Sequence, residues 1–288
     1  MFQRRLIRWL WLVTVLTTGN VTAGQITAEE KENQPCAECH AGIAESFAGT
    51  RMAIAASERF RRQWQDRESP DYCMNCHAPS GGEGLVCADC HGPGPHPYAK
   101  LDVPEVCARC HDAPGENTVR QFRQSPAARK GMNCLDCHLP DKKSGVDHRF
   151  EGPSVSGFLD NVAKLRLNMR LDESRGPTAV IQVSHRAGHA LPGGTTGRAV
   201  WSVVKGLKAD SAVAWTMSKR FGWEHHPVQG WLDRTLKPGR AAVLELDGLA
   251  RGDTVRIRAE LKYRFRAGPL DREDPREVGL DAVELGLP

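Results

Sequence analysis

Five copies of one short motif, Cys-x-x-Cys-His, constrain this chain more than any other feature of its sequence. All ten cysteines belong to these copies. The copies are Cys36-Ala-Glu-Cys39-His40, Cys73-Met-Asn-Cys76-His77, Cys87-Ala-Asp-Cys90-His91, Cys107-Ala-Arg-Cys110-His111 and Cys134-Leu-Asp-Cys137-His138. In this pattern the two thiols add to the vinyl groups of a haem, and the histidine becomes the proximal iron ligand. The sequence therefore predicts five covalently attached haem c groups.

Two other readings of paired cysteines predict different chemistry. Cys-x-x-Cys pairs also hold zinc or form redox disulfides, and an even number of cysteines in an exported protein is typical of a disulfide scaffold. Neither reading explains why a histidine follows every pair. The chain has 11 histidines in 288 residues. A chance histidine after all five pairs has a probability on the order of one in ten million, whereas haem attachment requires it.

The first 23 residues have the layout of a secretory signal. They begin with Arg4, Arg5 and Arg8, continue through the apolar run 9–16 and close with the small-residue site Val21-Thr22-Ala23. The apolar run is shorter than the roughly 20 residues that span a bilayer, which disfavours an uncleaved anchor. We expect a signal peptide at 1–23, export to the periplasm, and a mature chain without a membrane span that begins at Gly24.

Export also changes what the net charge implies. The formal charge of the whole chain is +4 at pH 7, but the leader contributes three arginines and no acidic residue. Each haem would add two propionate carboxylates. The mature, haem-loaded protein is therefore expected to be acidic overall, and nucleic acid is not an expected partner.

The mature chain divides into a cysteine-rich half and a cysteine-free half. We place the boundary near Pro153, which gives a pentahaem domain at 24–153 and a second domain at 154–288. The first half has few apolar clusters, so burial of its own side chains cannot offset the entropy of ordering the chain. Five porphyrins would supply the missing core. We expect loops and short helices, at 43–47, 53–64 and 119–122, to wrap around them.

The second half shows the two-residue periodicity of β-strands. Alternating or apolar runs cover 165–172, 178–184, 199–204, 212–218 and 241–246, and the clearest run covers 255–266. Breaks at Gly206, Pro238-Gly239 and Gly248 fit turns. The predicted fold class is α+β multidomain: a mainly helical and loop multihaem domain followed by an antiparallel β-sandwich of immunoglobulin-like type.

The strand at 255–266 predicts a basic outer face. Its apolar residues alternate with Arg256, Arg258, Glu260, Lys262, Arg264 and Arg266. Such a face either docks an acidic partner, because opposite potentials speed encounter, or is simply solvated.

The sixth ligand of each iron decides between an electron carrier and a catalyst. Once the five proximal histidines are assigned, six remain: His96, His148, His185, His189, His225 and His226. Six candidates for five positions permit full bis-histidine ligation without proving it, since a surface histidine is more often only solvated.

These motifs resemble those of multihaem c-type cytochromes related to the tetrahaem electron acceptor of hydroxylamine oxidoreductase and to pentahaem nitrite reductase. The resemblance covers most of the mature chain. The segment from Cys87 to His96 looks like the family's third motif followed by a distal histidine, which implies that role for His96. The segment from Cys134 to Pro140, followed by His148-Arg149-Phe150, resembles the family's Cys-x-x-Cys-His-Met-Pro and His-x-Phe arrangement, which implies a distal role for His148.

Two departures from the family pattern concern distal ligands. In the family, a helix after the first motif ends in Ser-x-His, whose histidine is a distal ligand; here Met52 stands in that position. Met52 would either ligate iron and raise the potential of that haem, or pack against a porphyrin face. Before the fifth motif, Ser125-Pro126-Ala127 replaces another Ser-x-His. Either another histidine reaches that iron, or one haem is left open.

The stretch 184–194 links the two halves by the same resemblance. Its residues, Ser184-His185-Arg186-Ala187-Gly188-His189-Ala190-Leu191-Pro192-Gly193-Gly194, resemble the Gly-His-x-Leu-Pro-Thr-Gly loop of sandwich domains appended to multihaem cytochromes. The histidine of that loop is thought to reach a haem iron, which implies a distal role for His189. His185, four residues earlier, is a further candidate. The adjacent pair His225-His226 lacks the spacing of a chelating pair, so a solvated loop is favoured there.

Three functions fit this sequence. The first is periplasmic electron transfer, with a quinol-linked cytochrome, a periplasmic reductase or an outer-membrane conduit as redox partner. The second is a multihaem redox enzyme that acts on a small nitrogen or sulfur compound at one open iron. The third is a non-catalytic subunit whose sandwich organises a complex. Electron transfer is favoured, because the Cys-x-x-Cys-Lys motif that marks the active haem of the similar nitrite reductases is absent.

Replacing Met52 with histidine tests the ligand hypothesis for that residue. If Met52 ligates iron, the Met52→His variant lowers the reduction potential of one haem, and any near-infrared methionine-to-iron band of the ferric protein disappears. Spectroelectrochemistry and near-infrared absorption measure the two effects. An unchanged potential and spectrum would mean that Met52 only packs against a porphyrin face.

Overall fold

The computed structural model describes most of the chain beyond the expected leader. The described residues are 36–64, 70–92, 96–98, 101–113, 116–139, 141, 147–172, 176–194, 196–247, 249, 253–266 and 268–287. The expected signal peptide at 1–23 lies outside them. Within these ranges, no helix has both the length and the apolar character needed to cross a bilayer.

Short helices occupy the described chain up to residue 138. They are α2 (Ala41–Ala48), α3 (Glu58–Trp64), α4 (Pro70–His77), α5 (Cys87–His91), α6 (Glu105–His111), α7 (Thr118–Arg123), α8 (Pro126–Arg129) and α9 (Leu135–His138). The last four cysteine motifs each end a helix at their histidine, and residues 36–39 of the first motif are helical as well. We refer to residues 36–150 as the helical half.

Aspartates inside two motifs begin their helical turns. The Asp89 carboxylate accepts a hydrogen bond from the Val86 N–H at 2.8 Å, and Asp136 accepts one from the Asn133 N–H at 2.7 Å. Each carboxylate satisfies an amide at the start of a helical turn, which otherwise has no intrahelical partner. Cys-x-Asp-Cys-His sequences thus stabilise the local turn that presents their cysteines and histidine.

Two of the three predicted helices are confirmed, and the third is correct only in part. The segments at 43–47 and 119–122 lie within α2 and α7. The segment predicted at 53–64 is helical only from Glu58. Before that residue, the Ala53 N–H bonds to Thr50 Oγ1 and the Ala56 N–H to the Glu83 carbonyl at 2.7 Å. These partners divert the backbone from helical hydrogen bonding, so the segment forms turns.

The rest of the chain forms two antiparallel sheets and a hairpin. One sheet has the order β1-β2-β7, from β1 (Ala163–Asp172), β2 (Gly176–His185) and β7 (Ala242–Leu246). The other has the order β4-β3-β8-β9, from β4 (Val213–Phe221), β3 (Ala199–Leu207), β8 (Arg256–Arg264) and β9 (Val278–Gly286). The hairpin joins β5 (Trp223–His226) to β6 (Gly230–Asp233).

The two sheets pack face to face around one apolar core. Ile181 and Val183 from β2 meet Val200 from β3 and Ile257 and Leu261 from β8, and all five side chains are almost fully buried. This core lies entirely within 158–287. The predicted strands at 165–172, 178–184, 199–204, 212–218, 241–246 and 255–266 correspond to β1, β2, β3, β4, β7 and β8. An antiparallel sandwich is therefore present.

The sequence analysis missed three strands. β5 and β6 are each four residues long, so each places only two residues on either face of its strand. Two residues are too few to show the two-residue periodicity that identifies a strand in a sequence. β9 pairs with β8 across a register shift between Leu261 and Lys262, and this irregularity interrupts a simple alternation. Because of this irregular pairing, β9 was not predicted from the sequence, although its apolar residues complete the sandwich.

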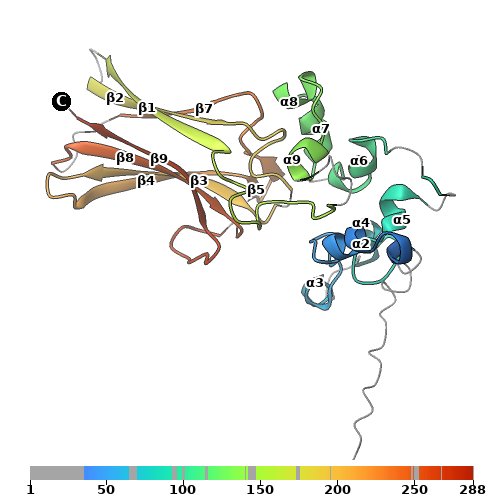
Figure 1. The fold of residues 1–288 in the computed structure, drawn as a ribbon. Helices are drawn as coiled ribbons and strands as arrows, with labels where there is room; N and C mark the ends of the chain where they lie inside the picture. Colours follow the sequence, from blue (N-terminus) through green and yellow to red (C-terminus); the bar gives the residue numbers. More distant parts are fainter. Residues whose placement is uncertain are drawn as a thin grey trace, which may run out of the picture.

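The helices and the sandwich lie at opposite ends of the molecule (Figure 1). Helices α7, α8 and α9 lie beside the sandwich, and α2 to α5 lie farther away. Contacts at this junction include Gly188 against Phe122 and Gly239 against Pro126. The fifth cysteine motif is thereby placed next to the sandwich, and the first lies at the far end.

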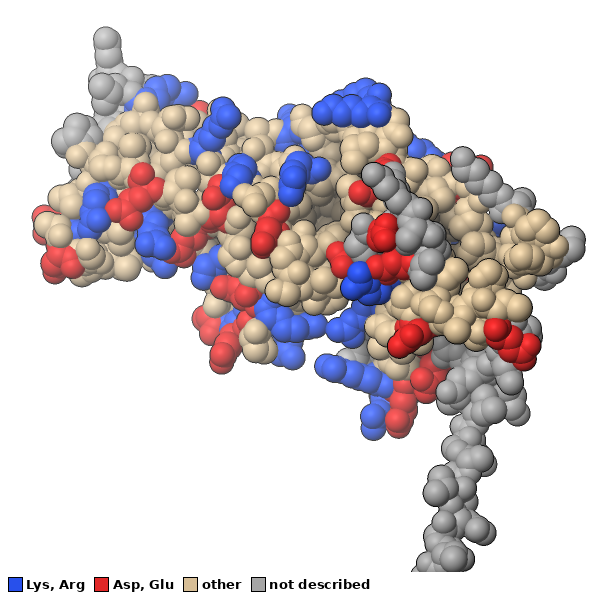
Figure 2. Space-filling model, viewed as in Figure 1, with Lys and Arg blue, Asp and Glu red and all other residues tan. Residues whose placement is uncertain are grey.

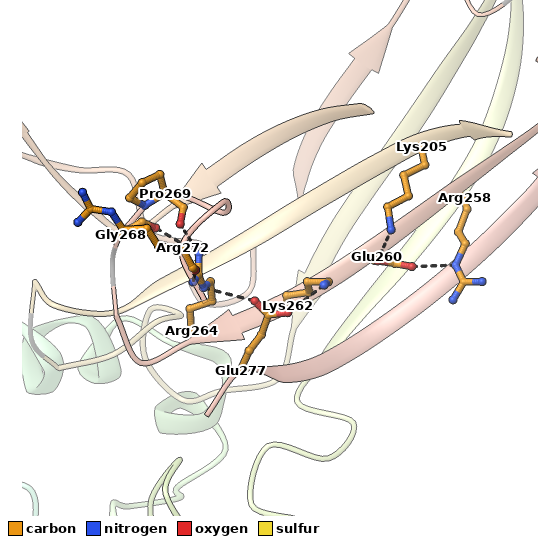
Figure 3. Close-up of polar contacts among 9 residues, drawn as sticks. All are labelled: Lys205, Arg258, Glu260, Lys262, Arg264, Gly268, Pro269, Arg272 and Glu277. Carbon is orange, nitrogen blue, oxygen red and sulfur yellow. Dashed lines mark hydrogen bonds and ion pairs between the residues drawn. The ribbon is translucent and has the colours of Figure 1, made fainter. Parts of the chain in front are cut away.

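Ion pairs neutralise much of the basic face predicted for 255–266. Figure 3 shows Glu260 between Lys205 and Arg258, at 3.3 and 2.9 Å. Lys262 pairs with Glu277 at 2.9 Å. On the face shown in Figure 2, basic and acidic side chains are interspersed. The strand thus does not by itself provide an unpaired basic surface for an acidic partner.

Arg264 does not face solvent, so the alternation predicted for that position is wrong. Its side chain is 1% exposed. The guanidinium donates hydrogen bonds to the carbonyls of Gly268, Pro269 and Arg272 and lies 3.3 Å from the Glu277 carboxylate (Figure 3). These acceptors satisfy a buried charge that would otherwise be costly. Arg264 therefore fixes the loop between β8 and β9.

Substitution of Arg264 should destabilise the protein much more than substitution of an exposed arginine on the same strand. Arg264→Met leaves three loop carbonyls without their donor and Glu277 with Lys262 alone, and we expect a loss of about 3 kcal/mol in the free energy of unfolding. Arg258→Met removes a half-exposed ion pair, and we expect a loss below about 1 kcal/mol. Urea denaturation followed by circular dichroism measures both; equal losses would contradict the role of Arg264.

Candidate functional site

Two motif histidines are oriented by backbone carbonyls behind their rings. His77 Nδ1 lies 2.8 Å from the Ala55 carbonyl, and His138 Nδ1 lies 2.7 Å from the Glu151 carbonyl. A carbonyl accepts only from a protonated nitrogen, so the proton is on Nδ1 and Nε2 carries the free lone pair. Histidine ligands of metals show this arrangement, in which one nitrogen bonds a carbonyl and the other the metal.

Three of the motif histidines face a second histidine ring. His40 and His96 have ring centres 5.8 Å apart, with planes inclined by 40°. His91 and His148 are 6.4 Å apart at 33°, and His138 and His189 are 6.2 Å apart at 9°. The second member of each pair is a histidine that the sequence analysis assigned as a distal ligand.

These spacings suit two imidazoles on opposite sides of one metal ion. A metal–imidazole bond is about 2 Å long, and the ring centre lies about 1 Å behind the nitrogen, so two trans rings have centres roughly 6 Å apart. Direct stacking of two rings would give a shorter spacing, as between Phe60 and His77 at 4.0 Å. The three pairs therefore leave room for a ligated iron between them.

Contacts with the first helix hold His148 in place. Its backbone N–H donates to Ser46 Oγ of α2 at 2.9 Å, although 102 residues separate the two. Phe150 packs edge-to-face against both His148 and Phe47. The segment after the fifth motif thus returns to α2 and brings His148 opposite His91.

The loop 184–194 carries His189 from the sandwich to the helices. On the sandwich side, Leu191 and Leu236 exchange two backbone hydrogen bonds of 2.9 and 2.8 Å. On the helix side, the Ala190 N–H donates to Gln121 Oε1 of α7 at 3.2 Å. Burial lowers the pKa of His189 to about 4, so its ring is neutral at pH 7, the form that ligates metals.

The same loop fills the space next to the missing Ser-x-His of the fifth motif. Ser125 is fully buried and caps α8 by accepting a hydrogen bond from the Ala128 N–H. Ala127, where the resemblance described in the sequence analysis implies a histidine, lies against Gly188, as does Phe122. The residue next to Gly188 is His189. The structure therefore places a histidine from the sandwich beside the position that lacks one.

His185 is placed differently from His189. Its Nε2 atom lies 3.1 Å from the Leu236 carbonyl, and burial lowers the pKa of the ring. The nitrogen that would reach a metal is therefore engaged with the backbone of the sandwich. His226 Nδ1 accepts from the N–H groups of Val228 and Gln229, and His225 packs against Trp231. His225 and His226 lie in the β5–β6 hairpin.

In the described structure, no histidine ring lies opposite the motif histidines His77 and His111. Phe60 stacks on the face of His77 and fixes its orientation. Met52 lies in the turn that supports His77, and its carbonyl accepts hydrogen bonds from Ala55 and Leu85. Burial is the main cause that lowers the pKa of His111, and the charges of His138 and Arg198 lower it further.

The ten cysteines are all described, and none forms a disulfide. Burial and the neighbouring Cys36 thiol raise the pKa of Cys87 to about 11, which places the first motif beside the third. A hydrogen bond from Cys107 lowers the pKa of Cys134 to about 7, which places the fourth beside the fifth. The contact between the first and third motifs passes over the second, so chain order is not spatial order.

Two further cysteine contacts connect the remaining motifs. Cys110 Sγ lies 3.9 Å from the Cys76 carbonyl, so the second motif adjoins the fourth. Cys90 of the third motif contributes to raising the pKa of Cys110, after burial and Cys76. The spatial order is therefore first, third, fourth and fifth, with the second beside the fourth.

The helical half has the donors for haem but little core of its own. Its buried apolar side chains among the described residues are Ala53, Ala56, Ala78, Val86, Val119, Phe122 and Leu139, and none belongs to the sandwich core. Thiols in Cys-x-x-Cys-His motifs, histidines with a free Nε2 and paired rings about 6 Å apart fit covalent haem. The residues present therefore suit this cofactor.

Comparison with known proteins adds a fold likeness. No family model matches this chain, and no curated protein matches its sequence. Among solved structures, the chain is similar to the penta-haem cytochrome c552 of Thermochromatium tepidum, with 17% identity and a TM-score of 0.65. The match covers 88% of this chain and 98% of that chain, so both the helices and the sandwich take part. At this identity the likeness shows a shared fold, and fold alone does not determine function.

A side chain at Gly193 should disturb the ring of His189. A Cβ atom at Gly193 would lie 2.4 Å from His189 Cε1, so in Gly193→Ala the ring must move. We expect one ferric haem to change from low spin to high spin, measured by magnetic circular dichroism of the haem-loaded protein. Gly279→Ala is the control, because its Cβ would meet nothing within 4 Å. An unchanged spin state in Gly193→Ala would contradict the placement of His189.

Proposed function

We propose that this chain binds five haem c groups and transfers electrons outside the cytoplasm. The observation that carries the proposal is the placement of His96, His148 and His189, each opposite a motif histidine at 5.8 to 6.4 Å. A chain that folds three such pairs beside Cys-x-x-Cys pairs is built to enclose irons from both sides. The fold likeness to a penta-haem cytochrome supports this.

The residue assignments follow from the motifs and the ring pairs. The cysteine pairs form the thioether bonds, and His40, His77, His91, His111 and His138 are the proximal ligands. His96, His148 and His189 are the distal ligands of the first, third and fifth haems. Met52 stays a candidate for one of the remaining irons. We assign His185 to holding the loop through Leu236.

The ligands suit electron transfer. Haem iron supplies one-electron chemistry by changing between its ferric and ferrous states. Two imidazoles on one iron leave no position for a substrate, which is the arrangement of a carrier. The backbone bonds at His77 and His138 fix the rings, so little rearrangement of the protein accompanies a change of iron charge.

The contacts between motifs suggest a path for electrons. The order first, third, fourth and fifth would run from the far end of the helical half to the junction with the sandwich, with the second haem joined at the fourth. Redox partners would then approach near the first motif or the second. A quinol-linked cytochrome, a periplasmic reductase or an outer-membrane conduit are the partner classes we propose.

We further propose the domain limits and location. A signal peptide at 1–23 would direct the chain to the periplasm, the haem domain would cover 24–153, and the sandwich 154–288. The sandwich would be of immunoglobulin-like type, since its seven main strands divide into sheets of three and four with crossovers between the sheets. In this arrangement the sandwich has a direct role in the redox domain, because it supplies His189.

A redox enzyme with one open iron is a second candidate function. The observation that favours it is the lack of a described histidine ring opposite His111. If Met52 serves the iron at His77, the iron at His111 has no distal ligand among the residues assigned above. An iron with a free position could bind a small nitrogen or sulfur compound, and the other haems would supply electrons.

Replacing His189 and His185 separately tests the ligand assignment. In the dithionite-reduced protein, carbon monoxide binds only an iron with an open or weakly held position. We expect His189→Ala to increase the carbon monoxide difference spectrum, relative to the wild type, by the amount of one haem. His185→Ala removes one contact with Leu236, but the two Leu191–Leu236 backbone hydrogen bonds still hold the loop, so the spectrum should stay unchanged. Equal responses of the two variants, or none in His189→Ala, would contradict the assignment.

A further inference from the structure

A polar cluster lies where the loop 193–198 meets the helical half. The Arg198 Nη1 atom donates to the Gly193 carbonyl at 3.3 Å. A Cβ atom at Gly194 would lie 3.3 Å from Arg198 Nη1 and 3.8 Å from Glu116 Oε2. Arg198 and Glu116 therefore approach the same glycine from the sandwich and from the helical half. No described ion pair of 4.0 Å or less joins them.

Tyr263 provides a hydroxyl group next to this cluster. Its ring lies in the sandwich core and is 1% exposed, but its hydroxyl has no hydrogen bond of good geometry. Burial raises the pKa of Tyr263, and the nearby Arg198 guanidinium opposes that effect. The guanidinium lies close enough to donate toward the hydroxyl oxygen, but it has no acceptor to offer, so the Tyr263 O–H has none among the described residues. A buried hydroxyl without a partner is costly, which points to an acceptor that both donors share.

Glu116 does not supply that acceptor well. Burial raises the pKa of its carboxyl, and the charges of Arg198 and His77 reduce the rise only in part. The Glu116 carboxylate also makes no close ion pair with the Arg198 guanidinium among the described contacts. Arg198 therefore lacks a close anionic partner among the described residues, although it lies in a half-buried position.

The cluster is also close to the motif histidine without an opposite ring. Arg198 lies near enough to His111 for its charge to lower the pKa of His111. His77 is also near enough to His111 to lower that pKa. On the other side of Gly193, the His189 ring packs against that glycine. Arg198 thus lies between the fifth haem site and the fourth, at the junction of the two halves.

We propose that Arg198 and Tyr263 form a binding site for a carboxylate-like oxyanion beside the haem held by His111. The site rests on the proposed haem binding and deepens it. Two donors from the sandwich, a guanidinium and a hydroxyl, would bind two oxygens of the anion. The anion is either a small free oxyanion bound at an open iron or a propionate of the haem itself.

Titration of the oxidised, fully haem-loaded full chain with nitrite tests the free-anion case. We expect a saturable change of the visible spectrum worth one haem. Because charge-assisted hydrogen bonds to an anion are strong, Arg198→Gln should weaken binding at least about tenfold and Tyr263→Phe about three- to tenfold. Arg186→Gln is the control, since the side chain of this exposed arginine bonds only the Asp160 carbonyl among the side-chain contacts described. It should leave nitrite binding unchanged.

Spectroelectrochemical titration of the same variants tests the propionate case. If no nitrite binds, Arg198→Gln and Tyr263→Phe should both shift the reduction potential of one haem, while Arg186→Gln shifts none. Five haems per chain with neither nitrite binding nor a potential shift specific to these two variants overturns the oxyanion site and leaves the proposed function intact. Fewer than five haems in the wild type would overturn the proposed function instead.

Discussion

The ring of His189, which lies parallel to that of His138, links the two halves of this protein. One ring follows a cysteine motif at the end of α9, and the other comes from a loop of the sandwich. The loop is held by Leu236 on one side and by Gln121 on the other, so the ring position depends on both halves. The helical half buries few large apolar side chains, and it therefore depends on cofactors and on such crossing contacts for its stability.

Much of the fold was accessible from the sequence, because local patterns determined it. Alternating or apolar runs predicted six strands, and two of the three helices predicted from the sequence are confirmed. The failures occur at residues whose hydrogen-bond partners the local sequence pattern does not reveal. At Ala56 the amide bonds a carbonyl 27 residues away, and at Arg264 three loop carbonyls allow a charge to be buried. Both depend on tertiary contacts.

The candidate site, like the fold, was predictable from the sequence only where a local motif determined it. The cysteines and proximal histidines follow from a motif with fixed chemistry, and the resemblance to multihaem cytochromes pointed to His96, His148 and His189. His185 and His189 share one loop, and only the structure distinguishes them, through the Leu236 carbonyl. Arg198, Glu116 and Tyr263 carry no motif, because the chain brings them together from a loop, a turn and a strand. No sequence signal would have found them.

Haem stoichiometry of the exported protein tests the central claim most directly. Intact mass after export, with a pyridine haemochrome assay of the same sample, gives the number of covalent haems per chain. The account predicts five, with both cysteines of every motif blocked to thiol reagents. Fewer than five haems, or reactive thiols, disulfides or bound zinc in any motif, would contradict it.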